Sequence, residues 1–174
     1  MYFNDSLDTL HEYIAFNSFS YLSPTLIGTV SNQNIHNTSA DIEYIIVSHP
    51  NFINAANRLA DFHENQDNLK SVVVTRQQIY NEFSSGMQDV SAIRDFMKFQ
   101  YDKENSELKY LLLFGDGSYD HKNRIENNTN YIPTYQSINS TAPTLTYVTD
   151  DYFGLLDDNE GLFVSDLVDI GIGR

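Results

Sequence analysis

Hydrophobic positions in the middle of the chain alternate between strand-like runs and helix-like stripes. Short runs rich in apolar and β-branched residues occur at 42–47, 69–75 and 110–114. Hydrophobic side chains recur at helical spacing over 52–64 and over 90–101. Polar turns separate these five segments. This order of strands and helices predicts right-handed βαβ units, and therefore a mainly parallel sheet with helices on both faces.

The pattern changes after the run that ends at Phe114. Residues 166–172 form a fourth strand-like run, so we expect an α/β fold with a four-stranded sheet. Residues 116–165 hold no helical stripe. Within them, the stretches 131–135 and 146–149 predict a β-hairpin. A connection of this length inside a compact domain is usually functional.

The N-terminal part of the chain has a different composition. Residues 1–40 are irregular and rich in Asn, Ser and Thr. Two stretches, 13–16 and 26–30, have the composition of short strands. We therefore divide the chain into a docking segment or tail of a preceding domain at 1–40, and a main α/β domain at 41–174.

Composition excludes several classes of protein. The formal net charge of -14 disfavours nucleic-acid binding and docking on an anionic membrane. The absence of cysteine among the 174 residues excludes a disulfide scaffold, a thiolate zinc site and a thiol nucleophile within this chain. No run of about 20 apolar residues occurs, so no membrane span is predicted. The first residues lack the features of a secretory signal peptide.

The third strand-like run ends in Gly115 and Asp116. Open α/β sheets place their sites at the carboxyl ends of the strands, and His49 follows the first run in the same way. Ser118 lies outside any Gly-x-Ser-x-Gly motif, so a serine nucleophile is not indicated. A phosphoacceptor receiver domain is disfavoured because the first run lacks an acidic pair and no lysine follows Lys122.

Acidic residues in the long connection are candidate ligands for a structural calcium ion. The candidates are Asp116, Asp120, Asp150 and Asp151. Calcium prefers six to eight oxygen ligands, which carboxylates supply. A helix–loop–helix calcium site is excluded because His121 stands where that motif needs glycine. The alternative is that these carboxylates cap turns by accepting hydrogen bonds from backbone N–H groups.

Six short tracts stand out by their order and spacing. They lie at 79–86, 92–96, 110–116, 131–133, 150–154 and 169–174. Together they resemble the gingipain-type cysteine peptidases. Four further tracts are similar to the cell-surface signal peptidase, or sortase, of the type IX secretion system of Bacteroidetes. These lie at 32–36, 48–50, 118–120 and 133–137, so the resemblance extends over about residues 10–174.

The resemblance implies a caspase-like, three-layer α/β catalytic domain in two subdomains, of which this chain supplies the first. It implies that the catalytic histidine and cysteine and an assisting acid belong to the second. No residue here matches them, so no catalytic residue is assigned. We expect the chain to be inert alone, since the reaction needs a thiolate and a paired imidazole. No cofactor is required, although a structural calcium ion fits the acidic residues.

The resemblance also implies a role for the parent protein. It would remove C-terminal sorting signals from secreted cargo at the outer-membrane surface or outside the cell. Its partners would be the remainder of the peptidase domain, the secreted substrates and outer-membrane secretion components. Two alternatives stay open, namely a non-catalytic interaction module of a secretion complex and an inactive homologue stabilised by calcium.

Overall fold

The computed structural model describes residues 4, 8–17, 19, 21–26, 28–139, 141–161 and 166–174. The chain divides into two compact units, Met1–Asn32 and Gln33–Arg174. The described residues of the first unit contain no helix or strand, and their large apolar side chains are mostly exposed.

Two strands expected in the first unit are not formed. Residues 13–16 are irregular, and so are the described residues of 26–30, while residue 27 lies outside the described residues. The physical reason is that a strand needs a neighbour to satisfy its N–H and C=O groups, and the described part of this unit offers none.

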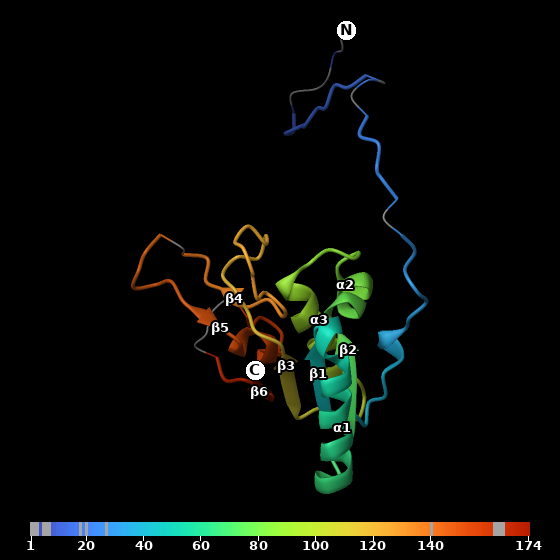
Figure 1. Cartoon of the computed structure of the whole chain (residues 1–174). Helices are drawn as coiled ribbons and strands as arrows, with labels where there is room; N and C mark the ends of the chain where they lie inside the picture. The colour runs from blue at the N-terminus through green and yellow to red at the C-terminus, as the bar shows by residue number, and fades with distance from the viewer. Residues whose placement is uncertain are drawn as a thin grey trace. The chain divides into compact units, whose positions relative to one another are not determined.

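The second unit is built on a four-stranded parallel sheet with the order β2-β1-β3-β6 (Figure 1). The strands are β1 (Tyr44–Ser48), β2 (Ser71–Thr75), β3 (Tyr110–Phe114) and β6 (Gly171–Gly173). The helices are α1 (Ile53–Asp67), α2 (Arg76–Phe83) and α3 (Val90–Tyr101). The described residues of this unit also form three 3₁₀ turns, η1 (Ile35–Asn37), η2 (Pro50–Phe52) and η3 (Asp151–Gly154). The α/β class and the parallel sheet are therefore confirmed.

Helices cover both faces of the sheet. All five residues of β1 are buried, and its side chains alternate between the two sides. On one side Tyr44 and Ile46 pack with Ala56 and Ala60 of α1. On the other side the core joins β1 and β3 to α2 and α3, and it includes the fully buried Phe96. The sheet is thus the middle layer of three.

Local capping explains where the helices begin. Asp89 accepts a hydrogen bond from the N–H of Ser91 at 2.8 Å, so α3 starts at the predicted residue. Thr75 and Gln78 form a capping box at the start of α2. The nitrogen Nδ1 of His49 accepts a hydrogen bond from the N–H of Asn51 at the start of η2. The end of β1 therefore turns directly toward α1.

The chain between β3 and β6 departs from the prediction in two ways. The predicted hairpin forms, but its strands are only β4 (Tyr135–Gln136) and β5 (Val148–Thr149). The last strand begins at residue 171, whereas 166 was predicted. Residues 166–170 are irregular because pairing with β3 starts only where Gly171 lies opposite Tyr110.

Residues just after Asn32 are fastened to α2. The carboxylate of Glu82 accepts hydrogen bonds from the N–H of Ile35 at 2.8 Å and from Nε2 of Gln33 at 2.9 Å. It also accepts from the N–H of His36 at 3.2 Å and contacts the Nδ1 atom of that ring. One carboxylate thereby holds the first turn of the second unit in place.

None of the described helices is long and apolar enough to cross a bilayer.

Candidate functional site

The carboxyl ends of the four parallel strands meet at one edge of the sheet, as expected for an α/β fold. This edge carries His49 after β1, Arg76 after β2, Asp116 after β3 and Arg174 after β6. The predicted positions of His49 and Asp116 at a common edge are therefore confirmed. The sequence pattern does not mark either arginine as a site residue, although each directly follows a strand and Arg174 belongs to the tract 169–174.

The segment 129–134 lies across the end of β3. The N–H groups of Tyr131 and Ile132 both donate to the carbonyl of Asp116 at 3.0 Å. The side chain of Ile132 is fully buried. A Cβ on Gly115 would lie 2.9 Å from the Cβ of Tyr131, so the close approach of this segment requires glycine there.

The two arginines hold this segment from both sides. Arg76 donates from Nη1 to the carbonyls of Asn130 and Tyr131, at 2.7 and 2.6 Å. Arg174 donates from Nη1 to the carbonyl of Ile132 at 2.9 Å, and from the same atom to Gly115 at 3.0 Å. Charged donors make stronger hydrogen bonds than neutral ones, so the edge is a preorganised surface over β3.

Arg174 also binds Asp150, which precedes η3. Its Nε donates to Oδ2 at 2.8 Å and its Nη2 to Oδ1 at 2.6 Å, which is the bidentate geometry of a planar guanidinium and a carboxylate. The two side chains are 20% and 27% exposed, so the pair is partly shielded from water. The pair joins β6 to the return of the hairpin at the sheet edge.

The ring of His49 accepts a hydrogen bond through Nδ1 from the N–H of Asn51. Burial, followed by the charge of Arg76, lowers the pKa of His49 below its ordinary value. Its ring centroid lies 5.1 Å from that of Tyr131 in an edge-to-face arrangement. No thiol nucleophile accompanies it in this chain, because the sequence has no cysteine. His49 therefore packs against the segment over β3, and we assign it no catalytic role.

The acidic candidates are engaged by protein donors. Asp120 accepts hydrogen bonds from the N–H groups of Lys122 at 3.2 Å and Ile125 at 2.7 Å, and from that of Arg124. These bonds, led by the one from Ile125, lower the pKa of Asp120. Asp120 is 8% exposed, and its carboxylate organises a turn. This arrangement matches the turn-capping alternative.

The other acidic candidates do not converge with Asp120. Asp116 accepts from the N–H of Gly117 at 2.9 Å, Asp150 binds Arg174, and Asp151 is exposed at the start of η3. Among the residues that the structure describes, no three acidic, histidine or cysteine side chains gather closely enough to hold a metal ion. Calcium binding by these carboxylates stays a prediction, and their hydrogen bonds give it no support.

Comparison with known proteins identifies the family to which this chain belongs. The model of peptidase family C25 matches residues 37–174. The crystal structure of dimeric latent PorU from Porphyromonas gingivalis is similar to the chain, with 38% identity and a TM-score of 0.63. That match covers 77% of this chain and 14% of PorU. A search of curated proteins gives no significant match.

A second solved structure shows the same fold. The complex of Porphyromonas gingivalis RgpB pro- and mature domains has 21% identity and a TM-score of 0.50, and the match covers 76% of this chain and 24% of that one. The chain thus spans about a quarter or less of the solved relatives that it matches. The resemblance to gingipain-type peptidases is confirmed. Because the family model matches most of the chain, and PorU is 38% identical over 77% of it, the chain belongs to peptidase family C25.

Proposed function

We propose that this chain is the scaffold part of the catalytic domain of a cysteine peptidase that removes C-terminal sorting signals from type IX secretion cargo. The observation that carries the proposal is the 38% identity with PorU over 77% of the chain. The parent protein would act at the outer-membrane surface or outside the cell. The remainder of the peptidase domain would supply the catalytic histidine and cysteine.

The reaction defines what this chain cannot do alone. A thiolate attacks the carbonyl carbon of the scissile peptide, the C–N bond breaks, and the leaving amine takes a proton from the imidazolium. Water or an acceptor amine then displaces the thiolate from the thioester and releases the shortened protein. The chain has no cysteine to begin this sequence. Its contribution is therefore positional.

The carboxyl edge of the sheet supplies that contribution. Segment 129–134 is fixed by Arg76 and Arg174, and the exposed carboxylate of Asp116 lies beside it. A surface that is held by charged hydrogen bonds keeps its shape when a substrate arrives, which is what a cleft wall needs. We place one wall of the substrate cleft at residues 116–120 and 150–153.

The test uses the full gene product and a cargo protein that carries a C-terminal sorting signal. Mass spectrometry should show a new C-terminus at the signal boundary, and an amide adduct when a primary amine is added. Asp116→Ala should slow cleavage without changing the melting temperature, while Glu126→Ala, at another exposed acidic position, should leave cleavage unchanged. Binding of secretion components without any cleavage would favour the non-catalytic interaction module.

A further inference from the structure

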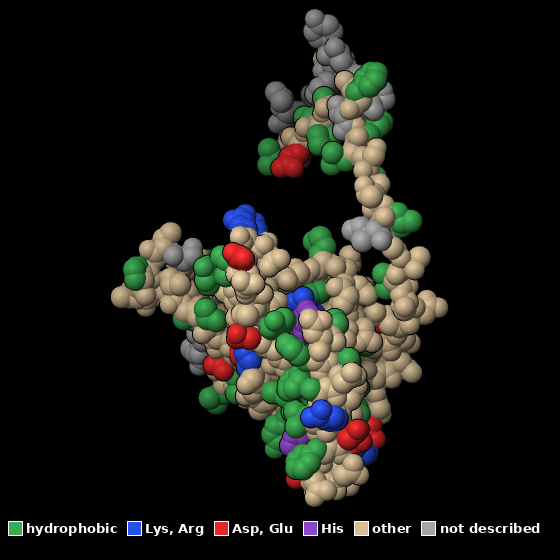
Figure 2. All heavy atoms as spheres, viewed as in Figure 1, with side chains coloured by type: hydrophobic (Ala, Val, Ile, Leu, Met, Phe, Trp, Pro, Cys, Tyr) green, Lys and Arg blue, Asp and Glu red, His purple; other side chains and the backbone are tan. Residues whose placement is uncertain are grey.

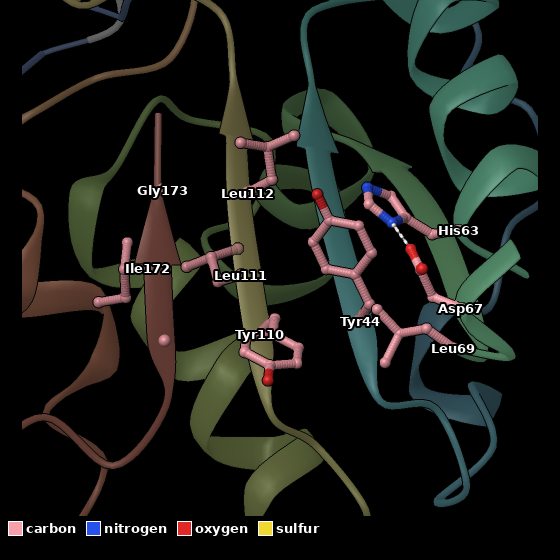
Figure 3. Close-up of a pocket in the computed structure, with 10 residues that line it drawn as sticks. Tyr44, His63, Asp67, Leu69, Tyr110, Leu111, Leu112, Ile172 and Gly173 are labelled. Atoms are coloured by element: carbon pink, nitrogen blue, oxygen red, sulfur yellow. Dashed lines mark hydrogen bonds and ion pairs between the residues drawn. The ribbon is translucent and has the colours of Figure 1, made fainter.

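A hollow of about 700 Å³ opens on the face of the sheet that α1 covers only in part (Figure 3). Tyr44 and Leu112 line it from β1 and β3, and His63 of α1 forms one side, where its ring pairs with Asp67 at 2.6 Å. On the β6 side of Tyr110 the floor of the hollow is backbone, because the residues that β6 contributes to this face are Gly171 and Gly173.

Strand register explains the shape of the hollow. One row across the sheet holds Tyr44, Tyr110 and Gly171 side by side. The next row on the same face holds Ile46, Leu112 and Gly173. Along both rows the side chains therefore become smaller toward β6, where each row ends in a glycine. Hydrophobic side chains gather at the surface beside α1, over β3 (Figure 2). Tyr110 is 47% exposed, which is high for a residue of an interior strand in a parallel sheet.

The path of the chain explains why this area is open. The connection from β1 to β2 contains α1, which lies on one face of the sheet. The connection from β2 to β3 runs in the opposite direction along the sheet, so its helices α2 and α3 lie on the other face. The connection from β3 to β6 continues in the same direction as the one from β2 to β3. Its residues Phe153, Leu156 and Ile170 join the core on the face that α2 and α3 cover. None of the described connections in the second unit leaves a helix over β3 and β6 on the α1 side.

The dimensions of the opening fit a helix. Adjacent strands lie about 4.8 Å apart, and a helix with its side chains is about 10 Å wide, so one helix covers about two strands. Helix α1 packs against β1 and β2 through Leu59 and Val73, among others. A second helix of the same width would cover the remaining two strands, β3 and β6.

We propose that the hollow is the seat of an amphipathic helix from the remainder of the family C25 peptidase chain, lying beside α1. The inference rests on the proposed function, because the solved relatives contain far more chain than this one, which covers 14% and 24% of them. A large apolar side chain of that helix fills the space over Gly171 and Gly173 and covers the ring of Tyr110. A second copy of this chain is disfavoured because two chains that each carry a net charge of -14 repel each other.

The test measures how fast a single introduced cysteine is alkylated at this face. Tyr110→Cys lies in the hollow, and Gly173→Cys is a second variant whose Cβ has only an ordinary contact, 3.6 Å from Leu112 Cδ1. Met87→Cys is the control, because Met87 is 71% exposed and lies outside the hollow. The 174-residue chain has no other cysteine, and peptide-resolved mass spectrometry separates these sites from any thiol elsewhere in the full gene product.

In the 174-residue chain, the cysteines at 110 and 173 should react within about tenfold of the control, since both are open to solvent. In the full gene product they should react at least about 100-fold more slowly, since modification then requires local opening, while the control is unchanged. A photoreactive benzophenone residue at position 110 should crosslink to residues past 174 that are spaced three and four apart.

Equal reactivity in a full gene product that still cleaves cargo would overturn the inference and leave the proposed function intact. Protection in the 174-residue chain that disappears on dilution would assign the hollow to a second copy and also overturn it. Protection that is independent of concentration there would assign the hollow to another part of the same 174 residues and would also overturn the inference. Protection with a crosslinked helix but without any peptidase activity would refute the proposed function instead.

Discussion

Arg174 and Asp150 are joined by two hydrogen bonds, at 2.8 and 2.6 Å, that tie the end of β6 to the residue before η3. The same guanidinium donates to the carbonyls of Gly115, Ile132 and Pro133. One side chain therefore fastens three segments that are far apart in the sequence. This arrangement shapes the carboxyl edge of the sheet, which is the edge that the proposed cleft wall occupies.

Replacing Arg174 with lysine should destabilise the chain. Lysine presents a compact point charge and cannot reproduce the planar fork, so several hydrogen bonds to carbonyls are lost. We expect the free energy of unfolding in urea to fall by about 1.5–3 kcal/mol. Arg58→Lys, on the exposed side of α1, is the matched control and should change it little. If Arg174→Lys were as stable as the control, the hydrogen bonds of the Arg174 guanidinium would contribute nothing to the free energy of unfolding.

Gly115→Ala tests the close packing of segment 129–134. An added Cβ would lie 2.9 Å from the Cβ of Tyr131 and 3.2 Å from Cγ1 of Ile132, so the segment must shift. We expect a loss of about 1–3 kcal/mol in the free energy of unfolding. Gly173→Ala is the control, because its Cβ meets only Leu112 Cδ1 at 3.6 Å, and it should change stability by less than about 1 kcal/mol. Equal effects of the two substitutions would contradict the packing argument.

The anchor at Glu82 predicts a specific pH dependence. Burial alone raises the pKa of Glu82, but hydrogen bonds from Ile35, Gln33 and His36 outweigh it and lower the pKa to about 2. A depressed folded-state pKa means that the stabilisation is complete above the ordinary value of 4.5 and is lost as the pH falls toward 2.

Wild-type chain should therefore exceed Glu82→Gln in the free energy of unfolding by a constant amount between pH 7 and about pH 5. The difference should shrink as the pH is lowered further. The exposed Glu126→Gln controls for the loss of one negative charge. A difference that grows on acidification would show that the carboxylate is not stabilised in its charged form.

Chelation should leave the chain unchanged. Both oxygens of Asp150 bind Arg174 and those of Asp120 accept backbone N–H groups, so calcium would compete with these donors for the carboxylate lone pairs. We expect the same melting temperature with EDTA and with added calcium. A melting temperature that falls with EDTA and recovers with calcium would instead restore the calcium-stabilised alternative, since a ligand stabilises the state that binds it.

The central sheet could be predicted because its signals are local. The apolar run of β3 was located at the residues where the strand forms, 110–114, and Asp89 marked the start of α3 through its capping hydrogen bond. These elements depend on short-range periodicity and on side chains that cap a helix directly. They would take the same form in many α/β proteins.

The edge of the sheet could not be predicted in the same way. The position of segment 129–134 depends on Arg76 and Arg174, which lie more than 40 residues from the carbonyls that they bind. The start of β6 depends on pairing with β3, because the glycines of that strand carry no hydrophobic signal. The acidic residues have a pattern that fits both calcium and turn capping, and the backbone N–H groups that Asp120 binds are contacts that the sequence pattern does not reveal.

The most direct test compares peptidase activity in the 174-residue chain and in the full gene product, before and after alkylation of thiols. We expect no cleavage of sorting-signal cargo by the 174-residue chain, because it contains no cysteine. We expect the full gene product to cleave the cargo and alkylation to abolish that cleavage. Cleavage by the 174-residue chain, or cleavage by the full product that survives complete alkylation, would contradict the proposed function.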